Sequence, residues 1–502
     1  MNVAHLLPRG AAMVGASAPA VALGDAALHD YAALTDRVRR LAGGLAAKGV
    51  GPGERIALFI ANRPEYVELL LAAWWAGAAV VPVNAKLTAA ELAAILGDAA
   101  PRLLFVSPET AEHGTDEAID VTSSAYATLL DHGPGPDDPV PVAPDALAWL
   151  FFTSGTTGRP KGAMIHHGSL LAASDAFLAD VDPLPPGTPM LHLAPMSHGS
   201  GLYILPALAV GGVQVVPETP GFRPAEVAAL SAAWPGACFF AAPTIVRRLV
   251  QEVRASGIVP RGLRTIVYGG GPLYPRDALE AGETLGPVLA QIYGQGESPM
   301  TITVQGREDF TAALARGDTA YLGSVGRPFS GMEVRIADAD DRPLPPGQTG
   351  EILVRGPAVC AGYWNDAEAT ARTFGGGWLR TGDLGRMDDT DLLTLAGRSK
   401  DLVITGGSNV YPVEVETVLL DHPDVREAAV VGLPHPDWGE AVTAFVASDA
   451  DPDRLAADLD ALCRSRIARF KCPKAYHVRP DLPKNAYGKI VKRALVPDPE
   501  AG

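Results

Sequence analysis

Residues 151–162, with the sequence FFTSGTTGRPKG, constrain this chain more than any other feature. The apolar run 146–152 predicts a buried strand that opens directly into a loop of hydroxyl residues and glycines. Glycines let successive backbone N–H groups turn toward one point, and the hydroxyls and Lys161 add donors and positive charge. The stretch therefore has the chemistry of a polyphosphate-binding loop, with a flexible surface loop as the alternative on composition alone.

The residues around Lys161 differ from the common P-loop, in which a glycine precedes the lysine and Ser or Thr follows it. Here Pro160 precedes Lys161 and Gly162 follows it. The sequence also contains no His-Glu-x-x-His, Gly-x-Ser-x-Gly or Rossmann glycine fingerprint. Zincin, α/β-hydrolase and dinucleotide-binding chemistry are therefore not indicated.

Composition narrows the class of protein further. A chain of 502 residues is too long for one hydrophobic core, so two or more domains are expected. The formal net charge of -16 argues against a general nucleic-acid binder. The four cysteines are scattered without a C-x-x-C pair, which suits a reducing cytosol and predicts neither a zinc site nor a disulfide framework.

The sequence shows no sign of secretion or membrane insertion. No basic cluster precedes an apolar core at the N-terminus, so a secretory signal is not expected. The most apolar window, 66–83, contains Glu68 and Pro82 and predicts a buried helix followed by a strand, not a membrane span. We therefore expect a cytoplasmic protein without a membrane span.

Strand-like and helix-like segments alternate through the first two-thirds of the chain, which predicts two α/β layers with parallel strands. The expected helices are 31–48, 64–77, 88–99, 223–234 and 244–255, and the expected strands are 55–60, 79–83, 102–106, 190–194, 213–216, 238–242 and 265–268. From about residue 321, Gly, Pro and short alternating runs predict a small β-rich unit. The roughly hundred residues after 397 are enough for a further domain.

Six further stretches carry residue types that suit a bound nucleotide or its chemistry, although each alone also fits an ordinary turn. They are 195–201 (PMSHGSG), 267–273 (VYGGGPL), 293–297 (YGQGE), 378–385 (WLRTGDLG), 397–400 (GRSK) and 482–489 (LPKNAYGK). A carboxylate such as Glu297 suits a magnesium ion bound mainly by phosphates. A carboxylate such as Asp383 can accept two ribose hydroxyls.

Together with TSGTTGRPKG, these stretches resemble the motifs of the adenylate-forming superfamily, which includes acyl-CoA synthetases, adenylation domains of peptide synthetases and firefly luciferase. The motifs occur in family order from about residue 30 to residue 489, and the chain looks most like a bacterial acyl- or aryl-CoA ligase. The resemblance implies an α/β fold with a large N-terminal domain, 1–396, of two α/β subdomains plus a β-rich subdomain. A small mobile α+β domain, 397–502, would follow as a lid.

The resemblance also implies roles for individual residues. The implied catalytic residues are Lys489, Glu297, Thr153 and His198. The implied ATP- or AMP-binding residues are Thr153, Ser154, Gly155, Thr156, Thr157, Gly158, Lys161, Gly269, Gly270, Gly271, Pro272, Tyr293, Gly294, Gln295, Gly296, Glu297, Asp383, Arg398 and Lys489. Glu297 would hold Mg²⁺, and Lys400 would be the hinge of the lid. Gly296 departs from the family threonine, so one phosphate contact should be weakened and space should open in the adjoining acyl pocket.

Two further sets of residues follow from the resemblance. The implied acyl pocket contains His198, Tyr203, Phe239, Phe240, Gly269, Gly270, Gln295, Gly296 and Met300. The implied coenzyme A contacts are Gly406, Gly407, Arg466 and Lys471, the last two within a basic cluster that a solvated helix face would also explain. The mostly apolar pocket favours an aryl, arylpropenoic or medium-chain acid over acetate.

The implied reaction is ATP-dependent joining of a carboxylic acid to coenzyme A through an acyl-AMP intermediate, with Mg²⁺ as the cofactor. A lysine at the developing negative charge, here Lys489, would stabilise attack of the carboxylate on the α-phosphorus. Loading of a separate carrier protein and a luciferase-like oxygenase activity are the alternatives. A ligand binder without activity is disfavoured by Lys489, Asp383 and Glu297. The oligomeric state, including a homodimer, is left open.

Overall fold

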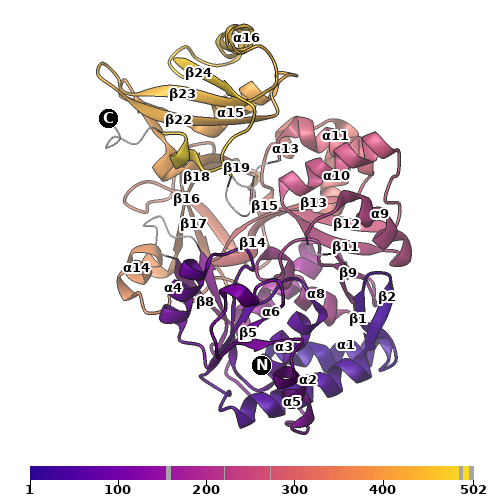
Figure 1. The fold of residues 1–502 in the computed structure, drawn as a ribbon. Helices are drawn as coiled ribbons and strands as arrows, with labels where there is room; N and C mark the ends of the chain where they lie inside the picture. The colour runs from indigo at the N-terminus through magenta and orange to yellow at the C-terminus, as the bar shows by residue number, and fades with distance from the viewer. Residues whose placement is uncertain (154–159, 220, 272, 485–489, 497–502) are drawn as a thin grey trace. The chain divides into compact units, whose positions relative to one another are not determined.

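The computed structural model describes residues 1–502 except 154–159, 220, 272, 485–489 and 497–502 (Figure 1). Contacts divide the chain into two compact units. The first contains Met1–Leu273, Asp277–Val334 and Val354–Leu379, and the second contains Tyr274–Arg276, Arg335–Leu353 and Arg380–Gly502. The boundary between residues 396 and 397 stays a prediction.

A six-stranded sheet carries the strand before the predicted phosphate loop. Its order is β6-β5-β3-β4-β7-β8, and its strands are β3 (Arg55–Phe59), β4 (Ala79–Pro82), β5 (Leu103–Val106), β6 (Ile119–Asp120), β7 (Leu147–Thr153) and β8 (Lys161–His166). All neighbours are parallel except the β7–β8 hairpin. The helices in this part of the chain are α2 (Tyr31–Ala47), α3 (Pro64–Trp75), α4 (Ala89–Ala99), α5 (Ser124–Asp131) and α6 (His167–Ala176).

Local sequence explains where these helices begin. Asp30 accepts a hydrogen bond from the backbone of Ala33 at the start of α2, and Thr88 and Glu91 form a capping box at the start of α4. Helix α3 is buried along its whole length and β4 follows it, which confirms the predicted helix and strand in the apolar window. Among the described residues, every helix falls short of the length and apolar character that a membrane-spanning segment needs.

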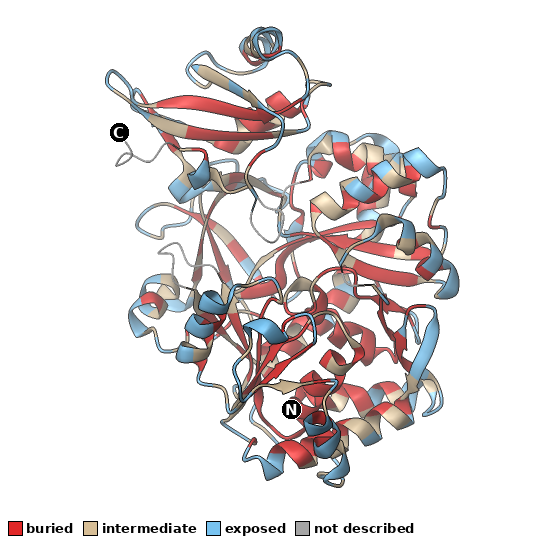
Figure 2. Ribbon diagram, viewed as in Figure 1, coloured by how far each residue is buried: buried red, intermediate tan, exposed pale blue. Residues whose placement is uncertain are grey.

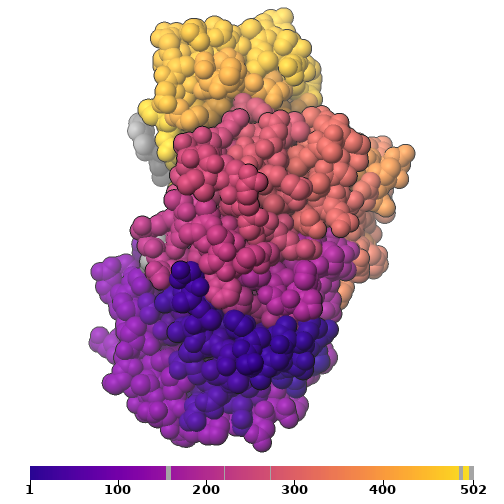
Figure 3. Space-filling view, turned by 90° about the vertical axis from the view of Figure 1, so that its right-hand side faces the viewer, coloured from indigo at the N-terminus to yellow at the C-terminus, as the bar shows by residue number. Residues whose placement is uncertain are grey.

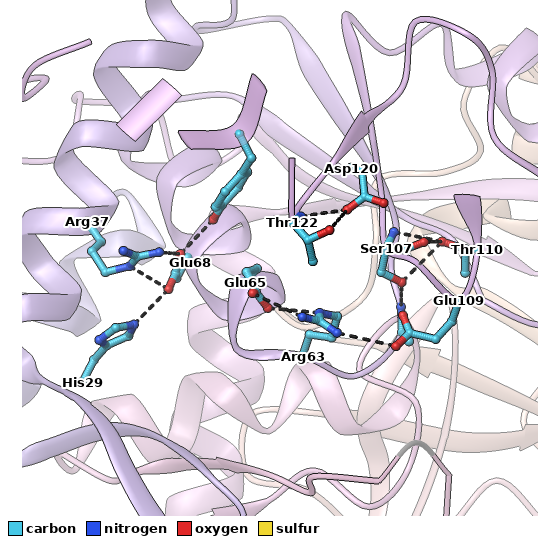
Figure 4. Close-up of polar contacts among 12 residues, drawn as sticks. His29, Arg37, Arg63, Glu65, Glu68, Ser107, Glu109, Thr110, Asp120 and Thr122 are labelled. Carbon is cyan, nitrogen blue, oxygen red and sulfur yellow. Dashed lines mark hydrogen bonds and ion pairs between the residues drawn. The ribbon is translucent and has the colours of Figure 1, made fainter. Parts of the chain in front are cut away.

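The acidic residue inside α3 is explained by a buried polar cluster (Figure 4). Glu68 accepts hydrogen bonds from Nε and Nη2 of Arg37, both at 2.8 Å, and from the hydroxyl of Tyr126 at 2.8 Å. Its Oε1 also lies 3.3 Å from Nε2 of His29. Burial alone would raise the pKa of Glu68, but hydrogen bonds from His29 and Arg37 outweigh it, so the pKa lies below its ordinary value. The cluster joins β2 (Ala26–Asp30), α2, α3 and α5.

A nine-stranded sheet forms the second α/β layer. Its order is β15-β14-β13-β12-β11-β9-β10-β1-β2, with β1 (Pro19–Leu23), β9 (Met190–Leu191), β10 (Gln214–Val216), β11 (Ala237–Ala241), β12 (Leu263–Tyr268), β13 (Leu289–Gln295), β14 (Ser298–Gln305) and β15 (Arg327–Pro328). The helices near it in sequence are α1 (Leu6–Val14), α7 (Gly199–Leu202), α8 (Ile204–Ala209), α9 (Pro224–Ala233), α10 (Pro243–Ser256), α11 (Pro275–Leu285), α12 (Arg307–Arg316) and α13 (Thr319–Leu322). The central strands are buried and the outer helix faces are exposed (Figure 2).

The N-terminal thirty residues belong to the same unit as these sheets. Strand β1 pairs in parallel with β10, although some 190 residues separate them, and β2 forms an edge of the nine-stranded sheet. In the space-filling view, the indigo N-terminal residues are continuous with the purple residues that follow them (Figure 3). The sequence predicted neither strand, because both are short and most of β2 is exposed.

Two smaller sheets follow. The β-rich unit predicted after residue 321 is confirmed as a sheet of order β16-β17-β18-β19, with β16 (Glu333–Ala337), β17 (Gly350–Arg355), β18 (Leu379–Met387) and β19 (Leu393–Arg398), and α14 (Ala367–Thr373) lies between β17 and β18 in sequence. The last sheet contains β20 (Val403–Thr405), β21 (Ser408–Val410), β22 (Glu427–His435), β23 (Gly439–Ala447) and β24 (Ala475–Arg479), with helices α15 (Pro412–Leu420) and α16 (Pro452–Arg466). The α/β class with a small C-terminal domain is thus confirmed.

Candidate active site

In sequence, the predicted phosphate loop lies between two paired strands. β7 and β8 are antiparallel, and their register sets Thr153 opposite Lys161. The predicted strand before the loop is confirmed, and β8 after it is an addition that the sequence did not signal. Ser154, Gly155, Thr156, Thr157 and Gly158 lie outside the described residues. The strand pairing therefore brings Thr153 and Lys161 opposite each other, with both side chains on the same face of the sheet.

The predicted metal-binding glutamate occupies a tight turn. Gln295, at the end of β13, pairs with Ser298, at the start of β14, so Gly296 and Glu297 form a two-residue turn between them. The Glu297 carboxylate accepts a hydrogen bond from the hydroxyl of Tyr363, 2.7 Å from Oε1. Burial raises the pKa of Tyr363, and the negative charge of Glu297 raises it further. The hydroxyl therefore stays protonated and donates the hydrogen bond to Glu297.

Tyr363 also contacts the lysine of the predicted phosphate loop. Nζ of Lys161 lies 5.2 Å from the centroid of the Tyr363 ring, within the range of a cation–π contact. The same ammonium lies 3.9 Å from Oδ2 of Asp366, a separation that makes a weak ion pair. One tyrosine thus touches both the lysine and the glutamate that the sequence assigned to the nucleotide, yet the sequence analysis did not identify it. A tyrosine after a glycine carries no signal of such a role.

The arrangement suits magnesium. None of the described residues bonds the second carboxylate oxygen of Glu297, and no three His, Cys, Asp or Glu side chains of the described chain gather as in an all-protein metal site. Mg²⁺ typically keeps several waters and binds through one or two carboxylates together with substrate phosphates. A single carboxylate beside a phosphate loop therefore fits such an ion.

The space beside Gly296 is not open, which corrects the expectation from sequence. A β-carbon on Gly296 would overlap Cγ2 of Thr153 and would lie 2.9 Å from Cδ1 of Phe151. The Thr153 methyl and the Phe151 ring already fill the volume that a side chain at 296 would take. The glycine therefore accommodates its neighbours instead of enlarging the acyl site.

Aromatic side chains continue from Phe151 through the predicted acyl residues. The His198 ring lies 4.8 Å from the Phe151 ring, and Tyr203 stacks on Phe240 with centroids 5.2 Å apart. A β-carbon on Gly199 would overlap the Phe240 ring, so Phe240 passes directly beside the residue after His198. Phe239 precedes Phe240 on β11 without a bulge, so the two side chains face opposite sides of the sheet and do not share one wall.

The residues predicted near adenine lie at the carboxyl ends of two neighbouring strands of the nine-stranded sheet. β12 and β13 are parallel neighbours, so their carboxyl ends lie on the same side of the sheet. Gly269 and Gly270, which follow β12, therefore lie on the same side as Tyr293, near the end of β13. A β-carbon on Gly269 would lie 2.5 Å from Cδ1 of Ile292, so only glycine permits this approach. Pro272 lies outside the described residues.

The β13–β14 hairpin contains a residue with a strained backbone. Met300, on β14, has φ of 68°, which is unusual for a bulky residue. A β-carbon on Gly294 would lie 2.9 Å from the backbone nitrogen of Met300, so the two strands approach closely here. Strained residues often cluster at functional sites, where the surrounding structure holds them in place.

Asn62 holds the chain that leads to His198, and sequence analysis did not identify it either. Its Nδ2 donates to the carbonyls of His192 at 2.8 Å and Ala194 at 2.7 Å, and its Oδ1 accepts from the backbone of Met196 at 2.8 Å. The fully buried His192 lies 2.9 Å from the hydroxyl of Ser200 on α7, and burial lowers the pKa of His192 to about 4. The ring is therefore neutral near pH 7, and these bonds fix both sides of the segment 195–199.

In the second compact unit, the predicted ribose-binding residues pair with each other. β18 and β19 place Asp383 opposite Arg398, and Arg398 Nε lies 2.9 Å from Asp383 Oδ1. Gly382 has φ of 68°, and its carbonyl accepts a hydrogen bond from Ser399 Oγ at 3.1 Å. Lys400, the predicted hinge, is exposed in the short turn that follows.

The residues predicted to meet coenzyme A fall on two features of the same unit. Gly406 and Gly407 form the turn of the β20–β21 hairpin, with φ of 54° and 77°. Lys471 bonds Glu414 at 2.6 Å and Arg466 lies 3.6 Å from Asp421, so acids partly neutralise the basic cluster. Lys489, the predicted catalytic lysine, lies outside the described residues.

Exposed aromatic side chains accompany this basic cluster. Trp438 is 39% exposed and Phe470 is 44% exposed. Nζ of Lys474 lies 5.5 Å from the Trp438 ring and 3.4 Å from the carbonyl of Arg469, next to Phe470. The second unit thus carries two partly exposed aromatic side chains beside lysine ammonium groups, and Trp438 also stacks on His435 with ring centroids 4.1 Å apart.

Comparison with known proteins places the chain among its relatives. A family model described as AMP-binding enzyme matches residues 9–364, and one described as AMP-binding enzyme C-terminal domain matches residues 414–489. The chain is 37% identical over 479 residues to a feruloyl-CoA synthase of Amycolatopsis sp, covering 95% of this chain and 94% of that protein. It is 35% identical over 453 residues to a 2-succinylbenzoate–CoA ligase of Geobacillus kaustophilus, covering 90% and 89%. The ATP-bound structure of MatB from Rhodopseudomonas palustris matches with a TM-score of 0.86 and 31% identity over 99% of this chain and 98% of that one.

Proposed function

Because the chain belongs to the AMP-binding enzyme family and is an enzyme of the AMP-forming acid–CoA ligase type, we propose that it joins an aryl, arylpropenoic or medium-chain acid to coenzyme A. In the first half-reaction the carboxylate oxygen attacks the α-phosphorus of ATP, and pyrophosphate leaves. In the second, the thiol sulfur attacks the acyl carbon, AMP leaves and the thiol proton is released. The mixed anhydride supplies the leaving group that a free carboxylate lacks.

The observation that carries this proposal is that Lys161 and Glu297 contact the same tyrosine, Tyr363. Lys161 follows the glycine- and hydroxyl-rich loop in sequence. An ammonium and a carboxylate so placed suit a magnesium-bound polyphosphate, because one neutralises phosphate charge and the other holds the ion. The ion would neutralise the charge that develops on the departing pyrophosphate. Lys161 would bind the phosphates, and the ribose would bind at Asp383, where Arg398 now lies.

The proposed acid class follows from the aromatic side chains around His198. The Phe151 ring contacts His198, and Phe240, which lies beside Gly199, stacks on Tyr203. Two such aromatic pairs favour a flat apolar acyl group over a short polar one. The two relatives with feruloyl and succinylbenzoate in their names act on aromatic acyl groups, which agrees with this preference.

Coenzyme A is the proposed acceptor because of the exposed Trp438 and Phe470. Aromatic faces stack on nucleotide bases, and nearby lysines attract phosphate groups. A free carrier protein would have less use for an exposed base-stacking surface. We therefore expect coenzyme A itself to accept the acyl group.

The test is a panel of acids incubated with ATP, Mg²⁺ and coenzyme A and scored by AMP release. Feruloyl-type, benzoyl-type and medium-chain acids should outpace acetate and malonate. Fastest turnover on acetate or malonate would refute the proposed acid class. If the enzyme catalyses pyrophosphate exchange but coenzyme A does not stimulate AMP release, the acceptor is a carrier protein. Oxygen uptake would point to an oxygenase.

A further inference from the structure

The backbone around Tyr363 is bonded both to β8 and to the turn that carries Glu297. Its segment forms an antiparallel bridge with Ala163 on β8, and the backbone N–H of Trp364 donates to the carbonyl of Gly162 at 2.8 Å. The backbone of Cys360 donates to the carbonyl of Glu297 at 2.8 Å. Residues 360–364 therefore connect the strand that begins at Lys161 with the turn that carries Glu297.

The side chain of Tyr363 uses its two chemically different parts for the two residues. The hydroxyl donates to Oε1 of Glu297 at 2.7 Å, and the ring face meets Nζ of Lys161 at 5.2 Å from its centroid. The ring of Phe374 packs edge-on against Tyr363, with centroids 5.7 Å apart, and supports its orientation. The contact with Glu297 uses the hydroxyl, and the contact with Lys161 uses the face of the ring.

We propose that Tyr363 is a positioning residue for nucleotide binding. Its hydroxyl fixes the rotamer of Glu297, so that Oε1 is engaged and Oε2 would be left to hold the metal ion. Its ring holds the Lys161 ammonium at the start of β8. This inference rests on the proposed function, since it assigns Glu297 to the ion and Lys161 to the phosphates.

The physical reason is preorganisation. A glutamate side chain has several rotamers, and a charge-assisted hydrogen bond selects one before the ligand arrives. A lysine side chain also loses considerable rotamer entropy on binding, and contact with an aromatic face removes part of that loss beforehand. Asp366 alone would hold the ammonium weakly, because its carboxylate is 3.9 Å away and partly exposed.

The two functions can be separated by two substitutions. Tyr363→Phe keeps the ring and removes the hydroxyl, whereas Tyr363→Leu removes both. The matched control is Tyr126→Phe, because Tyr126 makes the same kind of hydrogen bond, at 2.8 Å, to Glu68 in a cluster that shares no residue with this site. All variants are made in the full chain and checked by thermal melting.

The readout is ATP binding by calorimetry without an acid substrate, with and without Mg²⁺, together with the Mg²⁺ dependence of pyrophosphate exchange. For Tyr363→Phe, we expect unchanged metal-free ATP binding and an approximately tenfold rise in the Mg²⁺ concentration for half-maximal exchange. Saturating Mg²⁺ should restore most of the rate. Tyr363→Leu should also weaken metal-free ATP binding by about threefold, and Tyr126→Phe should behave like the wild type in every nucleotide measurement.

The outcomes separate this inference from the proposed function. If Glu297→Gln raises the Mg²⁺ requirement but Tyr363→Phe does not, the positioning role is refuted while the metal role stands. If Glu297→Gln itself leaves the Mg²⁺ requirement unchanged, the metal assignment fails first. In the double variant Glu297→Gln/Tyr363→Phe, no further loss beyond Glu297→Gln is expected, and an additive loss would overturn the inference even if the single tyrosine variant is unstable.

Discussion

The Cγ2 methyl of Thr153 occupies the position that a β-carbon on Gly296 would require. Thr153 ends β7 in the six-stranded sheet, and Gly296 lies in the turn between β13 and β14 of the nine-stranded sheet. The two sheets therefore meet at this pair without room for a side chain on both residues. The branched residue on one sheet and the glycine on the other form a matched pair.

Gly296→Ala should slow pyrophosphate exchange by tenfold or more, because forcing one more methyl into a packed site costs about 1–3 kcal/mol. Thr153→Ser keeps the hydroxyl and removes the methyl that the new β-carbon would meet. The double variant Gly296→Ala/Thr153→Ser should therefore recover much of the lost rate.

The control for that pair is Gly97→Ala, since a β-carbon on this glycine of α4 meets nothing within 4 Å. It should leave the rate unchanged and stabilise the protein slightly, by up to about 1 kcal/mol. Wild-type exchange in Gly296→Ala would show that the Thr153 side chain moves aside without consequence, contrary to the matched-pair interpretation.

Asn62→Ala should lower kcat/KM for the acid while leaving the KM for ATP nearly unchanged. The variant removes three hydrogen bonds that hold residues 192–196 ahead of His198, and unsatisfied buried groups cost about 1–3 kcal/mol each. Steady-state kinetics with each substrate varied in turn will measure the split.

Asn62→Asp provides the conservative comparison. Its carboxylate can still accept from the backbone of Met196, but it faces the carbonyl oxygens of His192 and Ala194 without a proton to donate. It should therefore impair the enzyme at least as much as alanine. Full activity of the aspartate variant would mean that the two donated bonds do not matter.

Lys161→Gln should weaken ATP binding several-fold, because the phosphates lose a cationic partner. Asp366→Asn should act in the opposite direction and tighten ATP binding by up to about fivefold, since an acid beside Lys161 is neutralised and exposed pairs are worth roughly 0.2–1 kcal/mol. Asparagine retains the capping function that Asp366 performs for α14. Calorimetry at two salt concentrations measures both effects, and weaker binding in Asp366→Asn would contradict the assignment of Lys161 to phosphate.

Glu68→Gln should destabilise the protein by about 3 kcal/mol near pH 7, because it removes the buried charge that pairs with the partly exposed Arg37 and His29. The pKa of Glu68 is lower in the folded chain than its ordinary value, so its stabilisation is complete above about pH 4.3 and is lost as pH falls through the folded-state pKa. The difference in urea-unfolding free energy between wild type and variant should therefore shrink in acid.

An exposed acid provides the control for this measurement. The side chain of Glu112 is 80% exposed, so Glu112→Gln should change the free energy of unfolding by less than about 0.5 kcal/mol at any pH. A gap between wild type and Glu68→Gln that stays constant down to pH 3 would show that the carboxylate charge is not what stabilises the cluster.

Local sequence determined the larger helices and the buried strands, because their apolar spacing and their caps are encoded within a few residues. Helix α3 and strand β4 follow from the window 66–83, and the strand before the phosphate loop follows from residues 146–152. The order of glycines, hydroxyls and charges also identified the family, since ligand chemistry requires those residue types in short stretches.

Only the tertiary structure decided which distant residues meet. Tyr363 lies 66 residues beyond Glu297 and Asn62 lies some 130 residues before the chain that it holds, and neither residue carries a local pattern that announces a partner. Whether Gly296 opens or closes space likewise depended on the side chain that another sheet brings against it. Sequence patterns record local backbone preference and residue chemistry, whereas contacts across sheets are fixed by strand register and packing, which no short stretch encodes.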